Sequence, residues 1–292
     1  MLIVKEIPVN GVKHPKPKSE LLPTHEFTMG LIAPKGAGKT TLMINLLLFY
    51  KRYFHRIIIF SPTIKNDEKW NYTRSIPFLA ENKQLKKVIK KISEKDTNKE
   101  IVENKPSNSG MAIKMFPNDD KTFTGLLPDD CYITEYDPST LARIVEQQQG
   151  MIDFLEENGY TKHVADRILI IFDDLVGSLL FTNKKGDTFK TLNTNHRHMS
   201  VSIFMVSQAY KEIPKTVRTN FTCLILFKIF SAKEIEAIHE EYPMDLQSKE
   251  WEEVYNYCTN EPHGFMFFDI KKKEGQRIMK NFTSHISIRK NK

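Results

Sequence analysis

The fold is decided by the stretch A-P-K-G-A-G-K-T-T, residues 33–41 of the 292-residue chain. It ends like a phosphate-binding loop, in which glycines permit the dihedrals that point several N–H groups into one hollow. Alanine stands at Ala33, where the usual pattern begins with glycine. Because alanine is the smallest replacement and removes no ligand group, we expect this stretch to form a P-loop.

The sequence on both sides of the loop supports this interpretation. An apolar strand pattern, F-T-M-G-L-I-A, precedes the loop, and an apolar helix pattern, K-T-T-L-M-I-N-L-L-L-F-Y, follows it. The helix would direct its N-terminal N–H groups and its dipole at a bound anion. Catalytic Lys39 is predicted to reach the β- and γ-phosphates of ATP, and the Thr40 hydroxyl to bind Mg²⁺. The predicted nucleotide-binding residues are Ala33, Pro34, Lys35, Gly36, Ala37, Gly38, Lys39, Thr40 and Thr41.

An acidic motif later in the chain also indicates ATP chemistry. Residues 167–174 read R-I-L-I-I-F-D-D, an apolar strand pattern that ends in two aspartates. Asp173, at the strand tip, is predicted to bind Mg²⁺ through water, and Asp174 to act as general base on the attacking water. Many ATPases carry glutamate at the second position; aspartate is one methylene shorter and can still polarise a water.

Three further side chains are candidates for catalysis. Gln208 follows the apolar run at residues 201–206 and is predicted to contact the γ-phosphate or its water. Charge that develops on the γ-phosphate needs another cation, often an arginine from a neighbouring subunit. We expect Arg197 to lie at the strand end opposite the nucleotide, where it could face a neighbour in a ring. Arg218 is the second candidate, and either arginine could instead form a surface salt bridge.

The alternation of apolar runs predicts an α/β fold. Besides the strand before the loop, four runs have the length and β-branched content of strands: residues 56–60, 167–172, 201–206 and 223–229. Runs this continuous are typical of strands covered on both faces. Helical patterns between them, the clearest at residues 139–158, predict βαβ units and a mostly parallel sheet. Ser231 and Glu234 fit a capping box at the start of a later helix, and residues 264–270 predict a final strand.

Composition divides the chain into a P-loop ATPase domain and three segments of other character. Residues 1–25 hold four prolines and predict an extended arm before the domain, which spans residues 26–270. Residues 66–121 are polar and lysine-rich, and are interpreted as an insertion that is helical around residues 84–93. Residues 271–292 carry eight Lys/Arg against one Glu and form a basic C-terminal segment.

The charge of the chain indicates the kind of partner, and its cysteines indicate the redox compartment. The formal net charge is +7, and residues 83–99 hold seven lysines. Such patches suit a polyanion such as nucleic acid, although solvated lysine-rich surfaces have the same composition. The cysteines, Cys131, Cys223 and Cys258, are scattered and odd in number, which indicates reduced thiols in an intracellular compartment. No apolar run is long enough for a membrane span.

Four motifs in a fixed order resemble those of a known family. They are A-P-K-G-A-G-K-T-T, L-I-I-F-D-D-L, N-H-R-H-M-S-V-S-I-F-M-V-S-Q-A-Y and I-P-K-T-V-R-T-N followed by L-I-L-F-K. In these motifs the chain resembles the DNA-packaging ATPases of large eukaryotic DNA viruses, the poxvirus-type branch of the FtsK/HerA superfamily. The likeness runs from about Phe27 to Tyr242 and leaves the insertion and the basic C-terminus largely uncovered.

The resemblance implies a RecA-like P-loop NTPase fold of the ASCE type, with central strand order 5-1-4-3-2. It implies ATP and Mg²⁺ as cofactors and a homo-oligomeric ring, hexamer or pentamer, that pumps double-stranded DNA into a preformed capsid. A capsid or portal vertex protein would be the docking partner. The location would be the viral assembly site in the host cytoplasm, or the virion. The resemblance also supports Arg197 as an arginine finger acting in trans and Gln208 as a sensor.

Two other functions are compatible with the same motifs. One is a P-loop nucleotide or nucleoside kinase, although the chain shows no arginine-rich lid. The other is an ATP-binding structural or adaptor protein with little hydrolysis.

Overall fold

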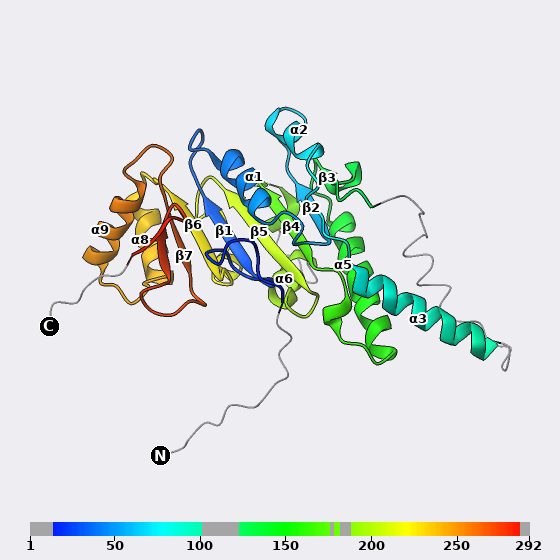
Figure 1. Cartoon of the computed structure of the whole chain (residues 1–292). Helices are drawn as coiled ribbons and strands as arrows, with labels where there is room; N and C mark the ends of the chain where they lie inside the picture. Colours follow the sequence, from blue (N-terminus) through cyan, green and yellow to red (C-terminus); the bar gives the residue numbers. More distant parts are fainter. Residues whose placement is uncertain (1–13, 101–122, 176–177, 182–187, 287–292) are drawn as a thin grey trace, which may run out of the picture.

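The computed structural model describes residues 14–100, 123–175, 178–181 and 188–286 of the chain. Within these ranges, helices cover both faces of a nine-stranded sheet in the order β3-β2-β4-β5-β1-β6-β7-β8-β9 (Figure 1). The strands are β1 Thr28–Ile32, β2 Arg56–Phe60, β3 Tyr132–Ile133, β4 Ile168–Asp173, β5 Val201–Ser207, β6 Cys223–Phe227, β7 Phe265–Asp269, β8 Ile278–Lys280 and β9 Ser284–Ile286. Strands β1 to β6 pair in parallel, whereas β7, β8 and β9 join the sheet antiparallel.

The α/β class predicted from the sequence is confirmed. The five principal strands, numbered along the chain, lie in the predicted order 5-1-4-3-2 as β6-β1-β5-β4-β2. The order of the whole sheet differs from the prediction, because β3 extends one edge and β7, β8 and β9 extend the other. The sequence pattern predicts β7 but not the short strands β3, β8 and β9.

Two hydrophobic layers explain why the strands are apolar throughout. In β4, Ile168, Ile170 and Phe172 face one layer, while Leu169 and Ile171 face the other. The first layer contains α5, α6, α8 and α9, and the second contains α1 and α2. The helices are α1 Lys39–Phe49, α2 Lys69–Arg74, α3 Lys83–Glu100, α5 Pro138–Glu157, α6 Thr188–Asn195, α7 Lys215–Arg218, α8 Ala232–Glu241 and α9 Ser248–Thr259. A parallel sheet covered on both faces needs apolar side chains at every strand position.

Helix α5 shows how local sequence sets the bounds of an element. Asp137 caps its first turn by accepting hydrogen bonds from the backbone N–H groups of Ser139 at 3.1 Å and Thr140 at 3.0 Å. Pro138 occupies the first helical position, where its missing N–H is not needed. Gly159 follows the C-cap with a φ of 79°, a conformation that glycine adopts without strain.

The capping box predicted at Ser231 is wrong. Ser231 is the N-cap of α8, but its side chain makes no capping hydrogen bond. The Glu234 carboxylate instead accepts a hydrogen bond from the backbone N–H of Lys211 at 3.2 Å, so it ties α8 to the loop after β5. A complete capping box does occur at α9, between Gln247 and Glu250.

The predicted domain division remains a prediction, but several of its segments take part in the fold. Trp70 and Phe78, in the first part of the lysine-rich insertion, are fully buried in the layer under α1. Helix α3 packs Leu85, Val88 and Ile92 into a separate cluster with α5 and then extends away from the sheet (Figure 1). The basic C-terminal segment contains β8 and β9. None of the helices in the described ranges combines the length and the apolar character that a membrane span requires.

Candidate nucleotide-binding site

Four of the predicted site residues, Lys39, Asp173, Asp174 and Gln208, lie at the carboxyl ends of the central strands. Strands β1, β2, β4 and β5 run in parallel, so their carboxyl ends lie at the same edge. The P-loop follows β1, Asp173 ends β4, and Gln208 follows β5. In open parallel sheets, ligands bind outside the carboxyl ends of the strands.

The P-loop has the backbone of an anion-binding cradle. Gly36 and Gly38 have φ angles of 82° and 106°, which favour glycine, and α1 begins directly after Gly38. The hydrogen bonds of the described residues leave unpaired the backbone N–H groups of Gly36, Gly38, Lys39 and Thr40. Four free N–H groups at a helix N-terminus suit a phosphate group.

Ala33 occupies a position that does not require glycine. Its φ is not positive, its side chain is fully buried, and its N–H donates to the carbonyl of Ser207 at 3.1 Å. The methyl group therefore belongs to the core, while the turn itself depends on the two glycines that follow.

Asp173 is a buried carboxylate whose hydrogen-bond partner within the described ranges is Ser61. Its Oδ2 accepts a hydrogen bond from the Ser61 hydroxyl at 2.7 Å, and only 3% of Asp173 is exposed. Burial raises the pKa of Asp173 to about 6, the adjacent charge of Asp174 acts in the same direction, and Ser61 and Lys39 oppose the rise. A divalent cation beside this carboxylate would replace the missing solvation and favour its charged form.

Asp174 and Gln208 form a side-chain pair on the solvent side of Asp173. The Gln208 Nε2 donates to both carboxylate oxygens of Asp174, at 3.0 and 2.9 Å. Asp174 has a φ of 52°, and its N–H donates to the carbonyl of Val206 at 3.1 Å. Gln208 thus orients the predicted general base.

The Lys39 ammonium interacts electrostatically with the carboxylates of Asp173 and Asp174. Burial lowers the pKa of its ammonium, while Asp174, Asp173 and Glu212 oppose this effect. The structure therefore brings together Lys39, Asp173, Asp174 and Gln208.

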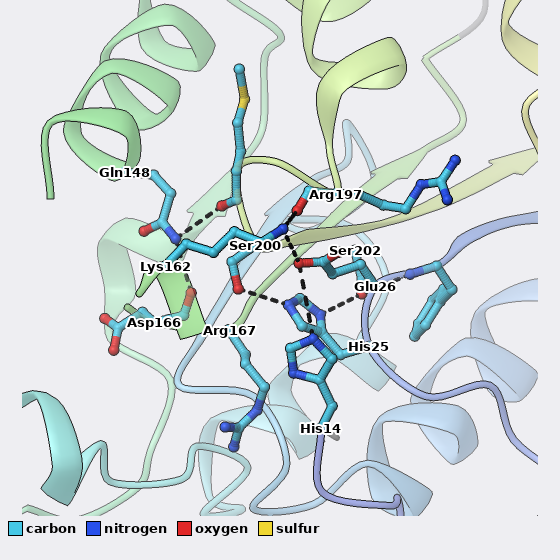
Figure 2. Close-up of polar contacts among 12 residues, drawn as sticks. His14, His25, Glu26, Gln148, Lys162, Asp166, Arg167, Arg197, Ser200 and Ser202 are labelled. Carbon is cyan, nitrogen blue, oxygen red and sulfur yellow. Dashed lines mark hydrogen bonds and ion pairs between the residues drawn. The ribbon is translucent and has the colours of Figure 1, made fainter. Parts of the chain in front are cut away.

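Arg197 lies at the amino ends of the parallel strands, opposite the P-loop, as expected. It precedes β5, and its side chain is exposed. Figure 2 shows the guanidinium pointing away from the polar cluster that holds its backbone. In that cluster, the Lys162 ammonium donates to the Arg197 carbonyl and pairs with Glu26 at 3.3 Å. Arg197 is therefore well placed to reach another molecule and badly placed to reach its own P-loop.

Arg218 is engaged inside the molecule. Its guanidinium donates to Glu241 at 2.8–3.1 Å and to the Ile213 carbonyl at 3.0 Å, and it lies over the Tyr210 ring. The hydrogen bond to Glu241 raises the pKa of Arg218 further above its ordinary value.

Two residues at the site were not found from the sequence. Ser61 directly follows β2, and a polar residue after an apolar run was a usable signal. His263 lies between α9 and β7, and its Nδ1 is 2.9 Å from the carbonyl oxygen of Ala37 in the P-loop. Nothing in the sequence around His263 indicates this contact, because the two residues are 226 positions apart.

The fold and the motifs define the class of the protein, which has the P-loop NTPase fold with a mostly parallel sheet. Within that class, the family model described as Poxvirus A32 protein matches residues 129–260. This match supports the resemblance stated from the motifs, and it covers Asp173, Asp174, Arg197 and Gln208 but begins after the P-loop. No curated protein sequence matches the chain significantly.

Solved structures confirm the fold. The genome packaging NTPase B204 from Sulfolobus turreted icosahedral virus 2, in complex with AMP, superposes with a TM-score of 0.51 at 12% identity. The same protein in complex with ATP-gammaS gives a TM-score of 0.50 at 14% identity. Each comparison covers 90% of this chain and 98% of the other.

Proposed function

We propose that the chain is an ATP-driven translocase that packages viral double-stranded DNA, acting as a ring at the assembly site in the host cytoplasm. The observation that carries the proposal is the position of Lys39, Asp173, Asp174 and Gln208 at one sheet edge, with Arg197 exposed at the other. The Poxvirus A32 match and the likeness to B204 support packaging as the process. A capsid or portal vertex protein would anchor the ring.

The residues of the nucleotide edge fit ATP and Mg²⁺. The free N–H groups of the P-loop would receive the phosphates, and Lys39 would neutralise their charge. Thr40 and the buried Asp173 would hold Mg²⁺, which lowers the charge that builds up on the transferred phosphoryl group. Asp174, held by both bonds from Gln208, would take the proton of the attacking water.

The main experiment measures ATP hydrolysis with and without duplex DNA. We expect DNA to stimulate the wild type, Lys39→Ala to lose ATP binding, and Asp174→Asn to bind ATP while its turnover falls about 10²- to 10⁴-fold. A nucleoside acceptor that stimulates turnover, when DNA does not, would identify a kinase instead. DNA movement at the wild-type rate by Asp174→Asn would identify an ATP-binding structural protein.

Arg197 would complete the site of the neighbouring subunit. Arg197→Ala should therefore bind ATP normally and lose about 10³-fold in turnover. Mixing Arg197→Ala with Lys39→Ala should restore part of the activity, because each variant supplies what the other lacks at a shared interface. Absence of rescue at every mixing ratio contradicts a role in trans.

The exposed lysines of α3 would contact DNA phosphates. Leu85, Val88 and Ile92 pack toward α5, so the opposite face of the helix carries Lys83, Lys87 and Lys90. The C-terminal segment is the weaker candidate, since Lys271, Lys272 and Lys280 already donate to protein acceptors.

A salt titration tests this surface. Replacing the three α3 lysines by alanine should lower the slope of log affinity against log salt by about 2–3. The matched control replaces three exposed lysines elsewhere: Lys211, Lys233 and Lys249. Equal slopes in both variants would remove α3 from the DNA path.

A further inference from the structure

His263 reaches the P-loop because the C-terminal part of the sheet is antiparallel. Strand β7 runs opposite to β6, so the residues before Phe265 lie beside the carboxyl end of β6 and, one strand further, of β1. The side chain of His263 closes this distance, with its Nδ1 2.9 Å from the Ala37 carbonyl oxygen. The ring also occupies the space beside the next residue, because a Cβ placed on Gly38 would lie 3.3 Å from the same nitrogen.

The chemistry of the two atoms fixes the direction of the hydrogen bond. A carbonyl oxygen only accepts, so the Nδ1 of His263 must carry the proton and donate it to Ala37. In a trans peptide unit, the C=O of one residue points away from the N–H of the next. Holding the Ala37 carbonyl toward His263 therefore aims the Gly38 N–H to the other side, which is the inside of the cradle. That N–H has no partner among the described residues.

The loop that carries His263 is itself held in place. The N–H of Gly264 donates to the Glu261 carbonyl at 2.9 Å, and the Glu261 carboxylate pairs with Lys280 of β8 at 2.8 Å. A Cβ on Gly264 would lie 2.7 Å from the Cys258 carbonyl oxygen, so the turn tolerates no side chain there. His263 has a φ of 61°, a left-handed conformation in which histidine and asparagine are enriched.

We propose that His263 is a positioning residue of the P-loop, which fixes the Ala37–Gly38 peptide in the orientation that binds phosphate. The inference rests on the proposed function only in taking a nucleoside triphosphate as the ligand of the P-loop. The antiparallel strands at the end of the sheet would then have a role, which is to connect the C-terminal segment with the P-loop.

The experiment compares two variants that both suit the left-handed backbone. His263→Gly removes the donor, whereas His263→Asn keeps a side-chain N–H that can reach a carbonyl. We expect His263→Gly to weaken binding of ATPγS with Mg²⁺ about threefold to tenfold in a calorimetric titration, as for loss of one hydrogen bond. His263→Asn should recover most of the affinity, and the exposed control His285→Ala should leave it unchanged.

A second readout does not depend on nucleotide. In protein labelled with ¹⁵N-glycine, the amide resonance of Gly38 should shift in His263→Gly and return toward its original position in His263→Asn. Unchanged affinity and an unmoved Gly38 resonance in His263→Gly overturn the inference. If the wild type binds no ATPγS, the proposed function fails, while the resonance of Gly38 still decides the role of His263.

Discussion

The substitution Ala33→Gly, which restores the glycine that usually begins a P-loop, should lower the free energy of unfolding. The methyl group of Ala33 is fully buried and the φ of Ala33 is not positive, so alanine is not strained in the folded state. Removing a buried methyl costs about 0.8 kcal/mol, and the greater backbone freedom of unfolded glycine costs about 0.5–1 kcal/mol more. The free energy of unfolding should fall by about 1.5 kcal/mol.

Thermal unfolding and calorimetry measure the two sides of this prediction. For a domain of this size, the melting temperature should drop by about 2–3 °C. The affinity for ATPγS should stay within about twofold, because no N–H group of the cradle is changed. Gly36→Ala is the contrasting variant: it has room for a Cβ, but its φ of 82° makes any side chain strained. A more stable Ala33→Gly variant, or one that binds ATPγS tenfold more tightly, would refute the reasoning.

Three other perturbations have outcomes that the structure determines. Arg218→Ala should lower the free energy of unfolding in urea by about 2 kcal/mol, because Glu241 loses a charged hydrogen-bond partner. An unchanged urea midpoint would show that this pair does not stabilise the fold and would leave Arg218 as a candidate for a role in trans. Gly30→Ala should destabilise by about 1–3 kcal/mol in the same assay, since its Cβ would lie 2.6 Å from the Phe221 ring; wild-type stability would contradict that packing. Asp173 must be ionised to bind a divalent cation, so Mn²⁺ affinity, measured by EPR without nucleotide, should rise with pH and level off above about 6; a flat profile that matches Asp173→Asn would exclude this ligand.

The ionisation of Asp173 also links pH to folding. Its pKa is higher in the folded protein than in the unfolded chain, where the ordinary value is 3.8. The folded state therefore binds the proton more tightly, and this contribution to stability is lost as pH rises through about 6. A bound cation reverses the preference, so the same rise in pH should favour the loaded protein.

The parts of the fold that the sequence predicted depend on short-range patterns. The apolar run of β4 and the turn chemistry around Gly36 and Gly38 are local, and the structure has the strand and the turn where expected. The prediction of a capping box at Ser231 is wrong because the Glu234 carboxylate accepts a hydrogen bond from the distant N–H of Lys211. A four-residue sequence pattern does not show that a distant donor competes for this carboxylate.

The candidate site was predictable to the same extent. Asp173 ends an apolar run, Gln208 follows one, and Lys39 follows the loop after the apolar strand β1, so parallel topology brings them to the same strand ends. Ser61 obeys the same rule but belongs to no familiar motif. The contact of His263 depends on β7 being antiparallel, which turns the start of that strand toward the nucleotide edge. The catalytic roles of these residues remain predictions.

The two short strands β8 and β9 cover the outer edge of the apolar strand β7. Strand β7, F-M-F-F-D, is buried throughout, and β8 occupies its outer edge by pairing Phe267 with Met279. The Phe282 ring then lies against the rings of Phe265 and Phe267. A chain shortened after residue 270 would present β7 as a flat, apolar edge with free backbone groups, a template for adding further strands. What looks by composition like a detachable basic tail is therefore expected to be a requirement for solubility.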